Sequence, residues 1–128
     1  MSLDVYLYEA QETIEECECP KCWTSHKHVY KRELYSRNIT HNLGKMADAA
    51  GIYYSLWRPD EMTPPAKLAK DITALLEQGL AKLEAEPDKF KAFNATNGWG
   101  TYDCLVEFTR DYLRACREYP EAEINVSR

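Results

Sequence analysis

The sequence lacks a long apolar run, and it has no excess of basic residues. No stretch of roughly 18 consecutive apolar residues occurs, which is the length that a membrane-spanning helix needs. The formal net charge is −5, from 21 acidic and 16 basic residues, and Lys27, Lys31 and Arg32 form the one small basic patch. Because duplex binding depends on clustered contacts to phosphates, we expect neither a membrane nor nucleic acid as the partner.

Sequence signatures of catalysis are also missing. The chain contains no HExxH, GxSxG, GxGxxG or GxxxxGK pattern, and no spacing of its acidic residues singles out an acid–base pair. An enzymatic activity is therefore not indicated. The expected function is a non-enzymatic binding or protein-interaction domain, whose partner is an unidentified protein or small molecule.

The composition is that of a folded domain. Of the 128 residues, 45% are hydrophobic and 12% aromatic, and no repeat occurs, so we expect a single domain over residues 1–128. The opening Met1–Asp4 carries neither a basic region nor an apolar signal run, which predicts a cytoplasmic protein. In a reducing compartment the five cysteines would be thiols or metal ligands.

Three segments are expected to form β-strands. Leu3, Val5 and Leu7 alternate with polar or amphipathic residues, and the polar stretch 9–16 extends this first strand. Residues 29–37 resemble the returning strand of a long hairpin. Near the end, Ile124 and Val126 alternate with Glu123 and Asn125, which predicts a short strand that pairs with the first one.

Helical spacing dominates the rest of the chain. Thr40 is a suitable N-cap for a first helix, which Gly51 would end, and residues 52–57 would add another turn or two. Thr63-Pro64 predicts the N-cap and first residue of a longer helix that ends before Pro87. We expect a short turn over 87–93 that buries Phe90 and Phe93. We also expect a last helix with Cys104 and Cys116 on or beside its apolar face, where both would be core residues.

The predicted fold class is therefore α+β. A small antiparallel sheet, made of the long N-terminal hairpin and the C-terminal strand, would be packed against three or four helices. The sequence shows no β-α-β alternation, so a parallel sheet is not expected.

The hairpin tip, at about residues 17–28, is rich in cysteine and histidine. Zinc prefers four tetrahedral thiolate and imidazole ligands, and the two-residue gap of Cys-Pro-Lys-Cys is typical of a zinc knuckle. Free thiols and a redox or inter-chain disulfide are the alternatives. The predicted structural zinc site would draw on Cys17, Cys19, Cys22 and either His26 or His28.

Loop tryptophans and one histidine are candidates for a binding site. His41 follows the proposed N-cap, where the positive end of the helix dipole disfavours a charged imidazolium, although the ring could equally pack there and satisfy a carbonyl. Trp57 and Trp99 each lie beside backbone breakers and could bind a ligand or seal the end of a helix. Gly98 and Gly100 indicate positive φ or close backbone approach around Trp99.

Several segments resemble a family of small uncharacterised proteins encoded by bacteria and by phages or prophages. The resemblance covers most of residues 1–8 and 36–128 and implies no particular activity. In that family the region that corresponds to 9–35 varies and often lacks the cysteines, which implies that the metal loop is an accessory. The similar segments are MSLDVYL at 1–7, NITHNL at 38–43, GIY at 51–53, LWRP at 56–59, NGWGTY at 97–102, EYP at 118–120 and VSR at 126–128.

By motif position, the resemblance implies a shared ligand-binding set. The alternative function is accordingly a small-molecule binding protein or enzyme with a pocket around His41, Arg58, Asn97 and Trp99. Such a pocket requires the start of the first short helix to meet the 94–100 loop. The full set that the motifs imply is His41, Asn42, Trp57, Arg58, Asn97, Trp99 and Tyr102.

Overall fold

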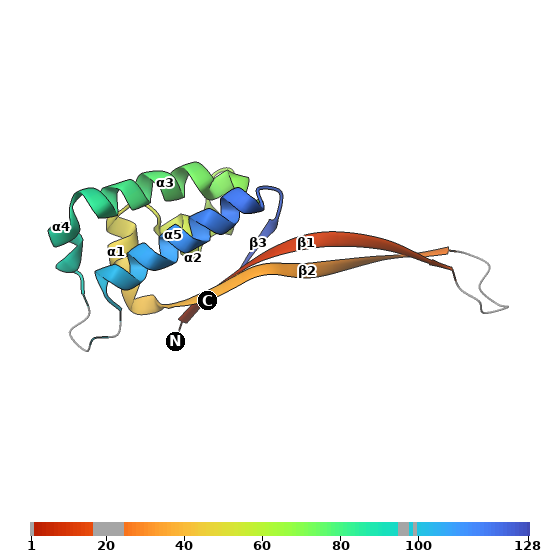
Figure 1. The fold of residues 1–128 in the computed structure, drawn as a ribbon, viewed down its shortest axis with the longest axis horizontal. Helices are drawn as coiled ribbons and strands as arrows, with labels where there is room; N and C mark the ends of the chain where they lie inside the picture. The colour runs from red at the N-terminus through yellow and green to blue at the C-terminus, as the bar shows by residue number, and fades with distance from the viewer. Residues whose placement is uncertain (1, 17–24, 95–97, 99) are drawn as a thin grey trace.

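The computed structural model of the chain describes residues 2–16, 25–94, 98 and 100–128, without the side chains of 10–16 and 25–30. It has the predicted α+β architecture, in which the helices gather over one end of a long hairpin (Figure 1). The elements in chain order are β1 (Ser2–Glu16), β2 (Ser25–Thr40), the 3-10 helix η1 (His41–Leu43), α1 (Gly44–Ala49), α2 (Tyr53–Trp57), the 3-10 helix η2 (Pro59–Glu61), α3 (Lys70–Ala85), α4 (Pro87–Lys91), α5 (Tyr102–Glu118) and β3 (Glu123–Ser127).

The sheet is antiparallel with strand order β2-β1-β3. Leu3, Val5 and Leu7 are fully buried, as their alternation predicts. A register shift follows Leu7, which pairs with Tyr35 while Tyr8 pairs with Glu33. Such a β-bulge increases the local bend and twist of the ribbon.

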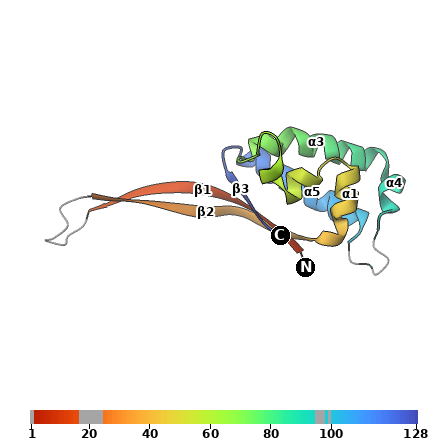
Figure 2. The same cartoon turned by 180° about the vertical axis from the view of Figure 1, so that it is seen from behind.

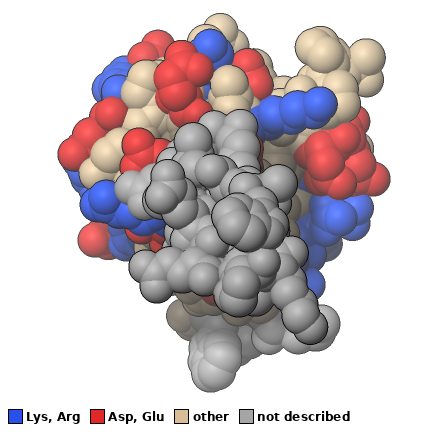
Figure 3. Space-filling model, turned by 90° about the vertical axis from the view of Figure 1, so that its right-hand side faces the viewer, with Lys and Arg blue, Asp and Glu red and all other residues tan. Residues whose placement is uncertain are grey.

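The hairpin extends well beyond the helical body. Because β3 pairs only with residues 4–8 of β1, residues 9–16 pair with 25–32 alone and form a two-stranded arm. Both ribbon views show this arm projecting away from the helices (Figures 1 and 2). Viewed along the arm, acidic and basic side chains are interspersed around the rim of the body (Figure 3).

Polar contacts join the sheet to α5. The Tyr35 hydroxyl donates to Asp111 Oδ2 at 2.9 Å, and Arg37 Nη1 lies 3.1 Å from the same oxygen. Burial opposes ionisation of Asp111, but hydrogen bonds from Tyr35, Arg114 and Arg37 outweigh it and lower the pKa of this carboxyl. This cluster fixes α5 over β2.

The start of α3 corrects the predicted helix boundary. The helix begins at Lys70, not at Pro64, because Pro65 disfavours a helical conformation for the residue before it. The preceding chain instead runs beside β3, where Leu68 bridges to Glu123 and the Ile124 amide donates to the Lys67 carbonyl at 2.8 Å.

Two further predictions about buried residues are wrong. Phe93 is 41% exposed, because α4 ends at Lys91 and only Phe90 faces the core. Cys104, in the first turn of α5, is exposed, whereas Cys116 is buried. Burial raises the pKa of the Cys116 thiol to about 12.

Asp71 stabilises the turn before α3, and we expect this stabilisation to depend on pH. Its carboxylate accepts hydrogen bonds from the Leu68 and Lys67 amides at 3.0 and 3.1 Å, which lower its pKa below the ordinary 3.8. Its stabilisation is therefore present above pH 3.8 and is lost as the pH falls through the lower, folded-state pKa. Asp71→Ala should cost about 1 kcal/mol at pH 7 in urea unfolding. A cost that stays unchanged at pH 2 would contradict this explanation.

For two buried tyrosines we expect opposite changes in stability when the hydroxyl is removed. Tyr102 donates its hydroxyl to the Leu83 carbonyl at 2.6 Å, whereas the buried Tyr112 hydroxyl has no hydrogen-bond partner among the described residues. Tyr112→Phe should therefore raise the free energy of unfolding by about 1 kcal/mol, and Tyr102→Phe should lower it by a similar amount. Paired urea titrations test this, and a loss of stability in Tyr112→Phe would show that its hydroxyl is satisfied.

Candidate functional site

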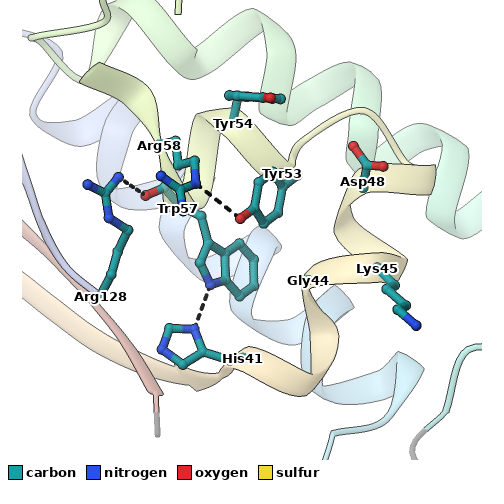
Figure 4. A pocket seen from close by; sticks show the side chains of 9 residues that line it. All are labelled: His41, Gly44, Lys45, Asp48, Tyr53, Tyr54, Trp57, Arg58 and Arg128. Carbon is teal, nitrogen blue, oxygen red and sulfur yellow. Dashed lines mark hydrogen bonds between the residues drawn. The ribbon is translucent and has the colours of Figure 1, made fainter. Parts of the chain in front are cut away.

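The site lies where the chain doubles back after the sheet. The Thr40 hydroxyl accepts the Asn42 amide at 3.3 Å, which confirms Thr40 as the N-cap of η1. Gly51, with φ of +80°, ends the α1 segment in the left-handed conformation, and α2 then returns toward η1. This reversal brings side chains of α2 against His41, as the close-up shows (Figure 4).

A hydrogen bond between Trp57 and His41 closes the base of the site. The indole Nε1–H donates to His41 Nδ1 at 2.9 Å, and Trp57 is only 3% exposed. A ring nitrogen that accepts an N–H must be unprotonated, so the proton of the neutral imidazole is on Nε2. His41 therefore offers a donor at Nε2.

Tyrosines form the wall of the site. Tyr53 stacks on Trp57 with ring centroids 5.5 Å apart and planes at 15°. Tyr54 meets Tyr53 edge-on at 5.4 Å and 85°, and Tyr54 is 53% exposed. The wall therefore consists of one ring held by its neighbours and one that is largely open to solvent.

Two arginines from distant parts of the chain complete the site. Arg58 Nε donates to the Tyr53 hydroxyl at 3.2 Å and its Nη1 donates to Glu61 at 2.8 Å. The hydrogen bond with Tyr53, followed by that with Glu61, raises the pKa of Arg58. Arg128 Nη1 donates to the Trp57 carbonyl at 3.1 Å and to Asp60 at 3.4 Å. Both guanidinium groups are thus oriented by protein acceptors.

These side chains line an open pocket of about 610 Å³. The aromatic wall and the arginines contribute to its lining, as do Gly44, Lys45 and Asp48 from α1. Lys45 and Asp48 lie toward the opposite end from Arg128 in the close-up (Figure 4). The pocket therefore combines an apolar aromatic surface with several cationic or N–H donor groups and the carboxylate of Asp48.

Only some of the candidate residues from the sequence meet here. His41, Trp57 and Arg58 line the pocket, whereas Asn42 is exposed beside it and does not. Tyr102 lies in α5, where it packs in the core and bonds to α3. Asn97 and Trp99 lie outside the described residues.

The pocket also contains residues that the sequence did not indicate. The spacing of Tyr53 and Trp57, four residues apart, places both on one face of a helix and could have indicated the stacked pair. Arg128 had no such signal, because its partner Trp57 is 71 residues away in the chain. Contacts of that range follow from the sheet topology alone.

The start of η1 does meet the 94–100 loop, as expected, but their contact lies outside the pocket that contains Arg58. A Cβ on Gly100 would lie 2.9 Å from Thr40 Cγ2, and Gly100 has φ of +109°, so both reasons for a glycine hold there. A smaller cavity of about 230 Å³ lies at this junction, between Arg37, Gly100 and Cys104. No described residue of the loop lines the pocket that contains Arg58.

The predicted metal ligands are not tested by the described side chains. Cys17, Cys19 and Cys22 lie outside the described residues, and so do the side chains of His26 and His28. Elsewhere in the described part of the chain, no three His, Cys, Asp or Glu side chains are grouped to hold a metal. Within the same part, no helix combines the length and apolarity that crossing a bilayer requires.

Comparison with known proteins adds no relative, so the resemblance to bacterial and phage proteins stays a prediction. No family model, no curated protein and no solved structure matches the chain.

Proposed function

We propose that this chain is a ligand-binding protein whose site is the pocket between η1, α1, α2 and Arg128, hereafter the α2 pocket. The observation that carries the proposal is the convergence of His41, Arg58 and Arg128 on a Tyr53–Trp57 stack. Binding sites for small molecules are typically apolar, concave and equipped with a few oriented polar groups. The volume of about 610 Å³ lies within the size range of such sites.

The two arginines are held in fixed orientations by the protein, which supports a ligand-binding function over a purely structural one. Arg58 and Arg128 are 39% and 37% exposed in their side chains, yet each is held by at least two acceptors. Holding a flexible arginine in one geometry costs conformational entropy. Because the folded protein already holds the arginines in place, a ligand does not have to order them, and a preorganised site of this kind binds more tightly.

A fragment screen by nuclear magnetic resonance tests the proposal. Fragments that bind should shift the Trp57 indole N–H resonance, assigned with Trp57→Phe, together with the amides of residues 41–45 and 53–58. The indole is the reporter of choice because its proton is bonded to His41. If fragments shift only resonances outside these segments, the pocket is not the binding site.

The hairpin supports a second function, a protein-interaction arm held by zinc at its tip. The specific observation is that residues 9–16 pair on one side only, so the backbone groups of their other edge have no strand partner in the described chain. An open edge of this kind is a template for a partner strand. Two-stranded ribbons are also marginally stable by themselves, which a metal at the tip would remedy.

The strand register distinguishes the two candidate histidine ligands. His26 pairs with Glu15, next to the last pair of the described hairpin, whereas His28 pairs with Thr13, two pairs farther back. Residues 25–28 therefore belong to β2 and not to the loop expected at the tip. At about 3.3 Å per residue, His28 begins roughly 7 Å farther from the cysteines. We therefore propose His26 as the fourth ligand beside Cys17, Cys19 and Cys22.

Metal analysis of untagged, reduced protein tests the zinc proposal. We expect about one zinc ion per chain, as for a closed structural site. His26→Ala should lose the metal, whereas the matched variant His28→Ala should retain it. Protein without stoichiometric metal would remove the zinc proposal, and equal loss in both variants would remove the assignment of His26.

A further inference from the structure

We infer that the ligand of the α2 pocket is an aromatic oxyanion, a planar ring that carries a phosphate or a carboxylate. The inference rests on the proposed function and adds the chemical class of the ligand. It follows from two unlike parts of the pocket that adjoin at the Arg58–Tyr53 hydrogen bond: the guanidinium groups, hereafter the guanidinium end, and the tyrosine rings, hereafter the tyrosine end.

The guanidinium end can bind one oxyanion with both arginines. Glu61 already lies 2.8 Å from Arg58 Nη1 and 3.9 Å from Arg128 Nη1, so a single carboxylate reaches both cations at once. The two arginines are therefore close enough for a ligand oxyanion to contact both. Arginine forks match the geometry of phosphate and carboxylate groups, which they bind through paired hydrogen bonds.

The same arginines retain donors that no described residue of the protein accepts. Within the described residues, Arg58 Nη2 has no hydrogen-bond partner, and neither have Arg128 Nη2 and Nε. His41 adds its Nε2–H in the same pocket, because its Nδ1 is occupied by Trp57. These unused donors favour an acceptor-only group, which an ionised phosphate or carboxylate is.

Asp60 and Glu61 orient the arginines without lining the pocket, and Asp48, the one carboxylate side chain among the described lining residues, lies toward the end opposite Arg128 (Figure 4). Asp60 and Glu61 belong to η2, and neither lines the α2 pocket. Their charges also lower the positive potential at the guanidinium end. An anionic ligand is repelled by the negative charge of Glu61, so removing that charge should strengthen the binding of an anion.

The tyrosine end fits a flat ring. Tyr53 is fixed by its stack on Trp57 and by the hydrogen bond from Arg58, and Tyr54 stands nearly perpendicular to it with an exposed surface. A planar ligand can stack on one of these rings and meet the other edge-on, and both arrangements are favourable for aromatic pairs. A free inorganic anion would leave this end empty.

Isothermal titration calorimetry with four probes tests the inference: adenosine 5′-monophosphate, indole-3-carboxylate, adenosine and inorganic phosphate. At least one aromatic anion should bind about tenfold more tightly than both adenosine and phosphate, because only it engages both ends. The stronger of the two aromatic anions identifies whether phosphate or carboxylate is preferred. Equal affinity for adenosine, or binding of phosphate alone, would overturn the inference, as would the absence of binding by both aromatic anions.

Matched variants locate the anion. Arg58→Gln and Arg128→Gln should each weaken the aromatic anion about tenfold, and Glu61→Gln should strengthen it several-fold. Arg117→Gln is the control, since Arg117 forms an exposed ion pair with Glu77 on the helical layer and does not line the pocket. Thermal unfolding of each variant verifies that it is folded. An equal loss in Arg117→Gln, or weaker binding in Glu61→Gln, would contradict the inference.

The outcome remains separable from that of the proposed function. If neutral fragments shift the Trp57 indole as strongly as anionic ones, the pocket is a binding site but its ligand is not an oxyanion. If no fragment maps to the pocket, both conclusions fail.

Discussion

Replacing Trp57 with alanine is expected to lower the free energy of unfolding by about 4 kcal/mol, the usual cost of deleting a large buried aromatic side chain. Trp57 is 3% exposed, stacks on Tyr53 and donates to His41. The substitution would leave a cavity and remove the support of the pocket wall. Urea unfolding followed by circular dichroism measures the change.

Trp57→Phe separates packing from the hydrogen bond. Phenylalanine keeps a ring against Tyr53 but removes the N–H that His41 accepts, so the expected cost is about 1 kcal/mol. If Trp57 instead lay on the surface, both variants would change the free energy of unfolding only slightly. A loss below about 1 kcal/mol in Trp57→Ala would therefore contradict the buried position of the indole.

Gly79→Ala is expected to destabilise the protein by about 3 kcal/mol, although alanine is ordinarily favoured over glycine inside a helix. A Cβ at this position would lie 2.0 Å from Ile52 Cγ2 and 3.4 Å from the Ala50 carbonyl oxygen. Ile52 is fully buried directly before α2, so it cannot move without shifting the element that carries Tyr53, Trp57 and Arg58. Denaturant titration gives the stability, and fragment binding reports on the pocket.

A neighbouring residue and a double variant provide the controls. Gln78→Ala lies on the exposed side of the same helix and should change stability by less than about 0.5 kcal/mol. Ile52→Ala removes the methyl group that clashes, so the double variant should be more stable than the sum of the single effects predicts. Simple additivity would show that α3 and the segment before α2 do not meet at Gly79.

Local sequence patterns predicted most of the elements. The alternation of Leu3, Val5 and Leu7 predicted β1, because one face of a strand repeats every second residue. Thr40 as an N-cap and Gly51 as a helix terminator were predictable because each depends on its own backbone and a few neighbours. The pairing of β3 with β1 was also predicted correctly.

Errors arose where tertiary contacts override a local signal. Thr63-Pro64 has the composition of a helix start, but the following proline and the pairing of residues 67–68 with β3 keep this segment out of the helix. The spacing of α5 did not reveal that Cys104 faces solvent, because a position at the edge of an apolar face is settled by its neighbours in space. Arg128 joins the pocket through the sheet, and no sequence pattern records that contact.

Filling the α2 pocket from Gly44 tests whether ligands bind in it. This residue lines the pocket in ordinary helical geometry, and a Cβ there would lie 3.5 Å from Tyr53 Cε2, an ordinary contact. The measurement is the dissociation constant of the fragments that shift the Trp57 indole. If ligands bind there, Gly44→Ala should leave this constant nearly unchanged. Gly44→Leu, which places a larger side chain in the pocket, should weaken binding at least about tenfold. Unchanged affinity in a folded Gly44→Leu variant would contradict binding in the α2 pocket.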